Sequence, residues 1–217
     1  FEVPGSTLTD VNFRDRFTTG NYESDEEYGL VEKYLNKNGT VLELGACIGV
    51  MSCWLNKLII NKEMQISIEA NPDLIEILEK NRNRNNCNFT ILNGMLSKNK
   101  NNIFYKHNII VGGSNFRKTD TAIEVPTISE DEIIRQLGKV DNVIIDIEGG
   151  ELEFVRDFGK IFSQATFVFL EVHPFANILT TAEVAEIENT LWQYGFDKLE
   201  FDRTGHHQAW VKTDRKE

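Results

Sequence analysis

Short apolar segments alternate with amphipathic helical patterns along most of this chain. Strands are predicted where apolar residues run together, at 40–45, 64–70, 88–94, 141–148 and 166–173. Helices are predicted where apolar residues recur every three or four positions, at 24–39, 49–59, 71–85, 129–138, 150–162 and 181–195. Strands and helices that alternate in this way build a parallel sheet with helices on both faces, which is an α/β fold.

The two ends of the chain depart from this alternation. Residues 1–23 are predicted to be an irregular lead-in, whereas 196–202 and 206–213 are two strands close enough in sequence to form an antiparallel hairpin at one sheet edge. With the hairpin, the predicted sheet is seven-stranded and mostly parallel. The 217 residues fit a single domain spanning 1–217, and the first residue, Phe1, leaves open that this is one domain of a longer polypeptide.

Residues 97–125 interrupt the pattern inside the domain. Segments 102–116 and 122–128 are predicted to be extended, and the first of them contains the glycine turn VGGSNF. Ser114 and Asn115 of this turn are candidates for contact with a substrate. A surface turn without a function explains the glycines equally well.

The composition excludes several classes of function. The formal net charge is −11, whereas a protein that follows a nucleic-acid backbone needs a basic face, so we expect no nucleic-acid partner. No apolar run approaches the roughly 20 residues that cross a bilayer, and the first residues show no signal-peptide pattern. Three cysteines without a C-x-x-C pair indicate reduced thiols. We therefore expect a cytoplasmic protein without a transmembrane segment.

The turn after the first strand, Glu43-Leu44-Gly45-Ala46-Cys47-Ile48-Gly49, suggests what the chain binds. In an open α/β sheet, ligands bind at the carboxyl ends of the strands, where glycines let the backbone come close to a ligand. A nicotinamide site uses the spacing G-x-G-x-x-G and places a pyrophosphate at the helix N-terminus. Here Glu43 precedes the spacing G-x-x-x-G, and its carboxylate would repel a pyrophosphate. It would suit a ligand that carries an ammonium or a sulfonium group.

A second carboxylate, Glu69, follows at the end of the next strand. An acid at this place can accept hydrogen bonds from both hydroxyls of a ribose. Together with the glycine turn, the two acids describe a nucleoside with a cationic, amino-acid-like tail, which is S-adenosylmethionine. The predicted cofactor site comprises Glu43, Gly45, Ala46, Gly49, Glu69, Ala70, Asn71 and Asp146.

Four motifs, VLELGACIG, IEANP, VIIDIEGGELEFV and LEVHP, make residues 20–175 resemble the FkbM family of methyltransferases. The resemblance implies a class I methyltransferase fold, which is Rossmann-like, and S-adenosylmethionine as the cofactor. It also implies methyl transfer to a hydroxyl, commonly on a sugar or a polyketide-like natural product. Two positions depart from the family pattern: Glu43 stands where aspartate is usual, and Gly150 where alanine is commoner. The first keeps the charge, and the second is expected to be harmless.

Side chains at the ends of two later strands are candidates for catalysis. Asp146 and Glu148 are two residues apart, as are Glu171 and His173, so in extended backbone each pair points to one side. Because an alcohol is a poor nucleophile, a base should accept its proton, and His173 is our first choice since an imidazole pKa of about 6.5 suits that role. A histidine that merely caps a strand end explains His173 about equally well. The predicted catalytic residues are His173, Asp146 and Glu148, and the predicted substrate-binding residues are Ser114, Asn115, Glu171 and His173.

A divalent metal is the alternative use of the same carboxylates. Three carboxylates near one histidine repel each other unless they are protonated, hydrogen-bonded or held by a cation. If a metal binds, Asp146, Glu148 and Glu171 are its expected ligands, and Mg²⁺ or Mn²⁺ would fit such oxygen donors. We favour a site without metal, because only Asp146 and Glu148 are certain to share a side.

The function that we predict is an S-adenosylmethionine-dependent O-methyltransferase acting on a hydroxyl of a sugar, in a glycan or a glycosylated natural product. A nicotinamide-dependent oxidoreductase is one alternative, which Glu43 and the missing G-x-G-x-x-G disfavour. A catalytically inert Rossmann-like binding module is the other, although such a module need not retain polar groups at so many strand ends. The expected partner is a small-molecule or glycan acceptor, and the oligomeric state is left open.

Overall fold

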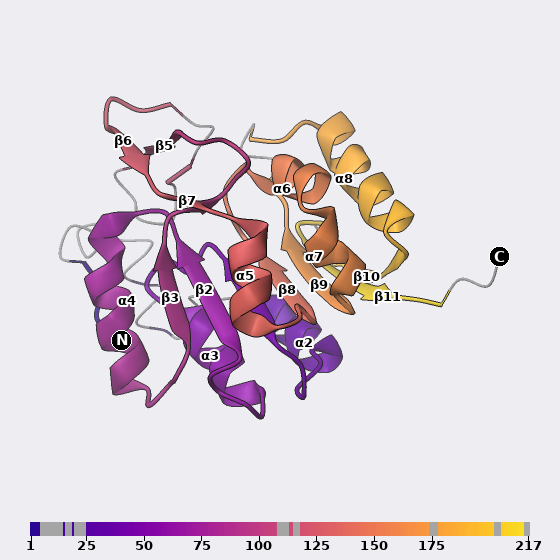
Figure 1. The fold of residues 1–217 in the computed structure, drawn as a ribbon, viewed down its shortest axis with the longest axis horizontal. Coiled ribbons are helices and arrows are strands. Elements are labelled where there is room, and N and C mark those ends of the chain that lie inside the picture. The colour runs from indigo at the N-terminus through magenta and orange to yellow at the C-terminus, as the bar shows by residue number, and fades with distance from the viewer. Residues whose placement is uncertain are drawn as a thin grey trace.

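A seven-stranded sheet forms the centre of the protein. The computed structural model describes residues 1–4, 15, 19, 25–107, 113–114, 118–173, 178–201 and 205–214. The strand order is β10 (Phe196–Phe201), β11 (His207–Lys212), β9 (Phe167–Glu171), β8 (Asn142–Ile145), β1 (Val41–Leu44), β2 (Gln65–Glu69) and β3 (Thr90–Asn93) (Figure 1). Strand β11 runs opposite to the other six strands of this sheet. The predicted α/β fold, with its mostly parallel sheet and its C-terminal hairpin, is confirmed.

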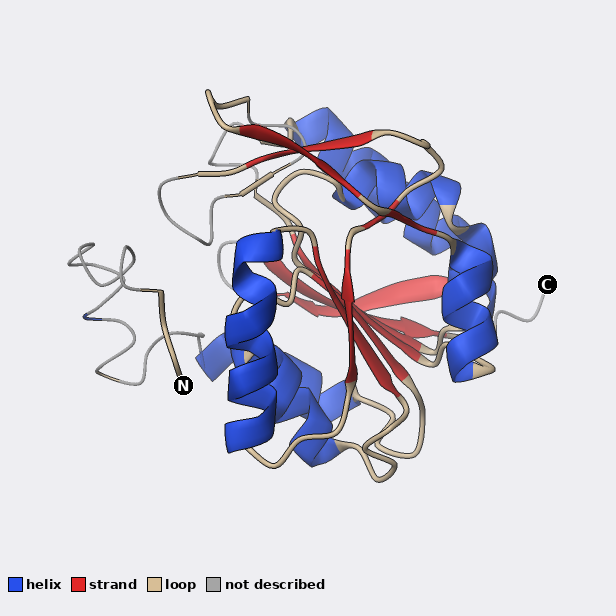
Figure 2. Ribbon diagram, turned by 60° about the vertical axis from the view of Figure 1, so that its left-hand side comes forward, coloured by secondary structure: helices blue, strands red, loops and turns tan. Residues whose placement is uncertain are grey.

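Helices cover both faces of the sheet, as Figure 2 shows in a view along its edge. One layer contains α2 (Asp25–Tyr34), α3 (Val50–Leu58) and α4 (Pro72–Arg84), and the other contains α5 (Glu130–Leu137), α6 (Glu151–Asp157), α7 (Gly159–Gln164) and α8 (Thr181–Gln193). Along β1, Val41 packs into the core under α2 and α3, whereas Leu42 and Leu44 pack into the core under α5 to α8. Because side chains alternate along a strand and both faces are covered, β1 is apolar on both sides.

One predicted helix is two helices in the structure. The pattern over 150–162 predicted a continuous helix, but α6 ends at Asp157 and α7 begins at Gly159, with Phe158 at φ −114° and ψ 46° between them. Phe158 is fully buried, and its ring stacks on that of Phe154 at 5.3 Å between centroids. The prediction of one continuous helix was wrong at Phe158, whose backbone leaves helical geometry.

Side-chain caps mark the starts of α4 and α5. The side chain of Asn71 accepts a hydrogen bond from the backbone N–H of Asp73 at the start of α4, and Ser129 does the same for Glu132 at the start of α5. Ser24, the first residue of the predicted helix 24–39, lies outside the described residues. Among the helices that the structure describes, none combines the length and the apolar composition that a bilayer crossing requires.

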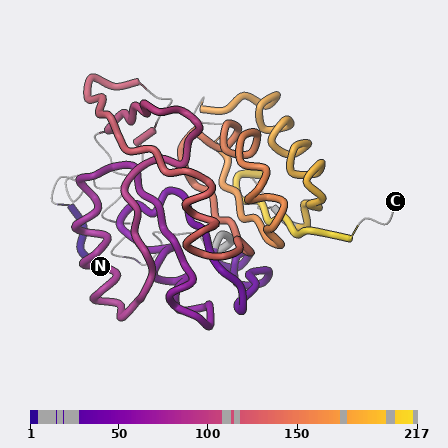
Figure 3. The backbone as a smooth tube through the Cα atoms, in the orientation of Figure 1, coloured from indigo at the N-terminus to yellow at the C-terminus, as the bar shows by residue number. Residues whose placement is uncertain are grey.

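The segment that interrupts the alternation forms two small sheets. Strand β4 (Met95–Leu96) pairs in parallel with β7 (Thr127–Ile128), and β5 (Asn102–Tyr105) pairs antiparallel with β6 (Ala122–Val125). The backbone traces of Figures 1 and 3 place β5 and β6 beyond the carboxyl ends of β2 and β3. The two extended segments that we predicted are therefore confirmed where the structure describes them, and they cover the edge of the sheet where ligands bind in α/β folds.

Candidate functional site

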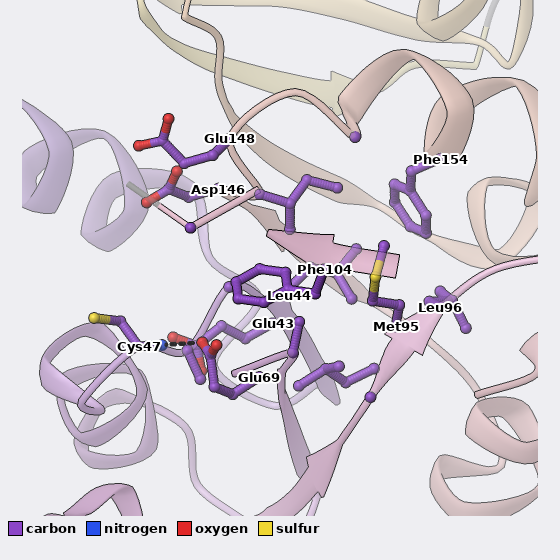
Figure 4. Close-up of a pocket in the computed structure, with 18 of the residues that line it drawn as sticks. Glu43, Leu44, Cys47, Glu69, Met95, Leu96, Phe104, Asp146, Glu148 and Phe154 are labelled. Atoms are coloured by element: carbon purple, nitrogen blue, oxygen red, sulfur yellow. Dashed lines mark hydrogen bonds between the residues drawn. The ribbon is translucent and has the colours of Figure 1, made fainter. Parts of the chain in front are cut away.

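A cavity of about 630 Å³ opens at the carboxyl ends of the central strands. This volume is in the range of small-molecule sites. Its walls come from the ends of β1, β2, β8 and β9, from the start of α3, and from β4 and β5. Figure 4 shows carboxylates and the Cys47 backbone on one side of the cavity, and Met95, Leu96 and Phe154 on the other. The cavity thus has a polar side and an apolar side.

The turn after β1 is held closely against the end of β8. Gly45 has a φ of +91°, and its backbone N–H and that of Ala46 both donate to the carbonyl of Ile68 at 3.0 Å. A Cβ on Gly45 would lie 1.7 Å from the backbone oxygen of Asp146. Only glycine fits this position, and the close approach brings Asp146 next to the turn, so that Gly45, Ala46 and Asp146 line the same cavity.

Gly49 is needed for the packing of two helices and not for the cavity. It has a φ of +86°, and a Cβ there would lie 2.4 Å from Cδ1 of Leu78 in α4. The residue does not contribute to the cavity wall described above. The second glycine therefore allows α3 and α4 to pack closely, rather than placing backbone against the cavity as the sequence suggested.

Glu69 is fixed by backbone donors. One carboxylate oxygen accepts from the N–H of Cys47 at 2.7 Å (Figure 4), and the other accepts from the N–H of Asn71, also at 2.7 Å. Burial raises the pKa of Glu69, and these backbone N–H groups, together with that of Ala70, act in the opposite direction. Glu69 and Ala70 line the cavity. Asn71 does not line it, but it caps α4 with its side chain and holds Glu69 through its backbone N–H. The side chain is thereby oriented before any ligand arrives.

Glu43 is also buried and lines the cavity. Its Oε2 accepts a hydrogen bond from the hydroxyl of Ser67, the residue beside it in β2, at 2.5 Å. Glu43 and Glu69 therefore end neighbouring strands on the polar side of the cavity, as the sequence predicted.

His173 lies among four carboxylates next to this region. Its Nε2 is 3.3 Å from Glu171 Oε1, 3.6 Å from Glu148 Oε1 and 3.8 Å from Asp146 Oδ1. Its Nδ1 is 3.7 Å from Oε1 of Glu151. The structure therefore brings together the four residues that the sequence placed at the ends of two strands, and it adds Glu151, which the sequence had explained as an acid in the first turn of a helix.

The carboxylates keep His173 protonated. Burial alone would lower the pKa of His173, but Glu151 and Glu171, followed by the two carboxylates after β8, raise it to about 11. Burial would in turn raise the pKa of Glu171, whereas His173 and His207 lower it to about 2. At pH 7 the cluster thus contains an imidazolium ion beside an ionised Glu171. This charge state differs from the neutral imidazole that a base at His173 requires.

Asp146 and Glu148 converge for a reason other than the one predicted. Strand β8 ends at Ile145, and Glu148 has a φ of +51°, so the two carboxylates do not follow strand alternation. They lie side by side because the chain turns sharply between Asp146 and Gly149 (Figure 4). The hydroxyl of Ser114 donates to the carbonyl of Glu148 at 2.5 Å and so braces this turn.

The proposed substrate loop only partly reaches the cavity. Gly113 lines it, and a Cβ there would be 2.4 Å from Cζ of Phe104, so this glycine lies flat against the ring. Ser114 is buried and pairs with Tyr105, away from the cavity surface. Asn115 lies outside the described residues. The ring of Phe104 and the imidazole of His207 are wall residues that sequence reasoning did not select, since only the folded β5 and β11 bring them here.

A metal ion has one candidate position in the part of the chain that the structure describes. One ligand atom each of Asp146, Glu171 and His173 lie within 4.8 Å of one another. The sequence had predicted Asp146, Glu148 and Glu171 as metal ligands, so the structure replaces Glu148 with His173 in this set. An ion at this position would need the neutral form of the imidazole.

Two comparisons of sequence indicate a family. Residues 43–198 match the model of the methyltransferase FkbM domain. The chain is also 27% identical over 147 residues to the hexuronic acid methyltransferase AglP of Haloferax volcanii, a match that spans 66% of this chain and 60% of that protein. The chain thus covers less than two thirds of the length of this relative.

Solved structures show the same fold. The fibrillarin pre-rRNA processing protein of Methanococcus jannaschii has a TM-score of 0.55 at 14% identity, over 84% of this chain and 70% of that one. An O-methyltransferase of Bacillus cereus in complex with SAH has a TM-score of 0.51 at 13% identity, over 97% and 92%. The predicted class I methyltransferase fold is confirmed by these neighbours. Since the FkbM model matches most of the sequence, the chain belongs to the FkbM family of methyltransferases, whose methyl donor is S-adenosylmethionine.

Proposed function

We propose that this protein is an O-methyltransferase that transfers the methyl group of S-adenosylmethionine to a hydroxyl of a sugar. The observation that carries the proposal is that one cavity joins the Gly45 turn and the carboxylates of Glu43 and Glu69 to the cluster around His173. The first part suits the cofactor, and the second suits an acceptor that must lose a proton.

The cofactor part of the cavity fits S-adenosylmethionine. When bound, this cofactor supplies a methyl group that is activated by the positive charge on sulfur. Glu69, held by two N–H groups, still has lone pairs on both oxygens for the ribose hydroxyls. Glu43 supplies negative charge for the ammonium group of the tail. The apolar side at Met95 and Leu96 offers a place for the adenine ring.

The acceptor part of the cavity contains the groups that would orient a hydroxyl. Asp146 and Glu148 present carboxylates that can accept hydrogen bonds from neighbouring hydroxyls of a sugar. Alignment of the acceptor oxygen with the bond to be broken is worth several kcal/mol by itself. Phe104 offers an aromatic face on the same cavity wall. Of the other predicted substrate contacts, we retain Glu171 and His173, which line the cavity, and leave Ser114 as a support for the Glu148 turn.

Two side chains, His173 and Asp146, are candidates to accept the proton of the acceptor hydroxyl. His173 was the first choice from the sequence, but its neighbours raise its pKa to about 11 and so keep it charged at neutral pH. We therefore assign the proton to the carboxylate of Asp146, whose side chain is the most accessible of the cluster at 44% exposed. The charged His173 then holds Glu148 and Glu171 in place by ion pairing.

A sugar acceptor is supported by the relative from Haloferax volcanii, which is a hexuronic acid methyltransferase. A uronic acid offers both hydroxyls and a carboxylate, so the bond formed has to be identified. The carboxylates in this cavity favour a neutral hydroxyl over an anionic carboxylate, because like charges repel in a partly buried site.

Two measurements test the proposal. Calorimetry should show binding of S-adenosylhomocysteine and none of NAD; the reverse would favour the nicotinamide oxidoreductase. Radioactive methyl transfer from S-adenosylmethionine to a panel of methyl glycosides and methyl glucuronides should then give an alkali-stable ether. An alkali-labile ester would overturn the hydroxyl assignment, and cofactor binding without transfer to any member of a broad glycan panel would favour the inert binding module.

A further inference from the structure

Glu151 is a fully buried carboxylate that the function described so far does not use. Both of its oxygens accept from the backbone N–H of Gly149, at 2.9 and 3.1 Å. Its Oε1 also lies 3.7 Å from Nδ1 of His173. One side chain therefore faces two parts of the cluster that are 24 residues apart in sequence.

The backbone that Glu151 holds is in an unusual conformation. Glu148 has a φ of +51°, which a residue with a side chain rarely adopts, and Gly149 has a φ of +113°. Such conformations persist only where the surroundings hold them. Ser114 donates to the carbonyl of Glu148 from one side, and Glu151 accepts from the N–H of Gly149 from the other. The peptide bond between Glu148 and Gly149 is thus held at its C=O by Ser114 and at its N–H by Glu151.

We infer that Glu151 is a positioning residue for methyl transfer: its carboxylate fixes the Glu148 turn and the His173 ring in one arrangement. This inference rests on the proposed function of the cavity. Glu151 does not line the cavity, so it acts through Glu148 and His173 rather than on a ligand.

The negative charge of Glu151 is needed for both tasks at once. A carboxylate has acceptor sites on both oxygens, so it can face an N–H of the backbone and the Nδ1–H of an imidazolium together. A glutamine side chain keeps the shape but has one oxygen, and its amide N–H₂ would face one of the two donors. Glu151→Gln therefore releases either Gly149 or His173 while leaving the volume of the core unchanged.

Glu130 provides a matched control. It is also the first residue of a helix, is also buried, and also accepts from a backbone N–H, that of Ile161 at 3.1 Å. Its other oxygen faces Lys98 at 3.3 Å, and it does not line the cavity. Glu130→Gln thus reproduces the loss of a helix-terminal charge and of a buried acceptor, but at a distance from the cluster.

The experiment compares the two variants with the wild type in kinetics, cofactor affinity, thermal stability and NMR. Glu151→Gln should lower kcat by about 100-fold, the effect of misplacing a reacting group by about 1 Å. Its affinity for S-adenosylhomocysteine should change by less than about threefold, since the proposed cofactor contacts at Glu43, Gly45 and Glu69 do not involve Glu151. Glu130→Gln should lose a similar amount of thermal stability and keep its kcat. NMR of ring-¹⁵N-labelled histidine should show the His173 signals moved in Glu151→Gln and unmoved in Glu130→Gln.

The outcomes separate the inference from the proposed function. Unmoved His173 signals, a kcat within about threefold of wild type, or equal losses of kcat in both variants would each overturn the positioning role. A wild type that transfers no methyl group contradicts the proposed function instead, and the NMR comparison, which needs no acceptor, then decides whether Glu151 fixes His173.

Discussion

The α-carbon of Gly45 faces the backbone carbonyl of Asp146 so closely that a methyl group on Gly45 would lie 1.7 Å from that oxygen. The contact joins the turn after β1 to the end of β8, and so joins the proposed cofactor part of the cavity to the proposed acceptor part. The distance between the two parts is therefore set by backbone packing rather than by side chains.

Gly45→Ala should be much more damaging than Gly138→Ala. Both glycines have positive φ, +91° and +73°, but a Cβ on Gly138 would have nothing within 4 Å. Alanine at Gly138 should cost about 1–2 kcal/mol from the backbone conformation alone. At Gly45 the overlap with Asp146 adds about 1–3 kcal/mol. Urea denaturation of both variants measures the difference, and equal losses would mean that the Asp146 contact imposes no constraint.

Glu69→Gln should weaken the binding of S-adenosylhomocysteine by about 1.5 to 3 kcal/mol, the scale of a hydrogen bond to a charged group. The amide loses the charge and one acceptor, and it also disturbs the bonds from Cys47 and Asn71. Calorimetry gives the affinity. Glu76→Gln, on the exposed side of α4, is the control for a change of charge. An affinity equal to that of the wild type would remove Glu69 from the cofactor site.

His173 should make the stability of the protein depend on pH. Its pKa is 6.5 as a free side chain and about 11 in the fold, so the folded state binds the proton more tightly than the unfolded state. Its contribution is fully present below pH 6.5 and is lost as the pH rises towards 11. The difference in unfolding free energy between wild type and His173→Gln should therefore shrink from pH 6 to pH 10 in denaturation experiments. A constant difference would show that the ring is not held as a cation.

The pH dependence of turnover separates the two assignments of the base. With the proton passing to Asp146, kcat should be flat between about pH 7 and pH 9, because a carboxylate is already ionised there. With neutral His173 as the base, kcat should rise about tenfold per pH unit over the same range. The reason is that the neutral fraction of the ring grows tenfold per pH unit as long as the pH lies below its pKa of about 11. Initial rates at saturating cofactor and acceptor decide between them.

The parts of the site that depend on neighbouring positions in sequence were predictable, and those that depend on long-range packing were not. Glu43 and Glu69 end consecutive apolar runs, so parallel pairing of the strands was enough to bring them together. The partner of Gly49 is Leu78 in the next helix, and no local pattern reveals that contact. The left-handed conformation of Glu148 likewise depends on a hydrogen bond from the distant Ser114. Strand alternation therefore predicted correctly that Asp146 and Glu148 lie together, but for a reason that the structure does not support.

The cluster around His173 is expected to work without a metal ion. Asp146, Glu171 and His173 place one ligand atom each within 4.8 Å of one another, which removes the argument that too few ligands share a side. The protonation of His173 nevertheless disfavours a metal ion. His173 with a pKa of about 11 carries protons on both nitrogens at pH 7, and an ion would have to displace one of them. The imidazolium already supplies positive charge to the surrounding carboxylates, so we expect a metal-free reaction.

Exhaustive EDTA treatment should therefore leave methyl transfer at the level of the untreated protein, and added Mg²⁺ or Mn²⁺ should change the rate by less than about twofold, because the protonated ring of His173 cannot act as a ligand. Calorimetry with Mn²⁺ alone supplies a readout that needs no acceptor, and His173→Gln is its control. Loss of turnover on chelation with recovery on adding Mg²⁺ or Mn²⁺, together with Mn²⁺ binding that disappears in His173→Gln, would show that the ion displaces the proton and would assign Asp146, Glu171 and His173 as its ligands.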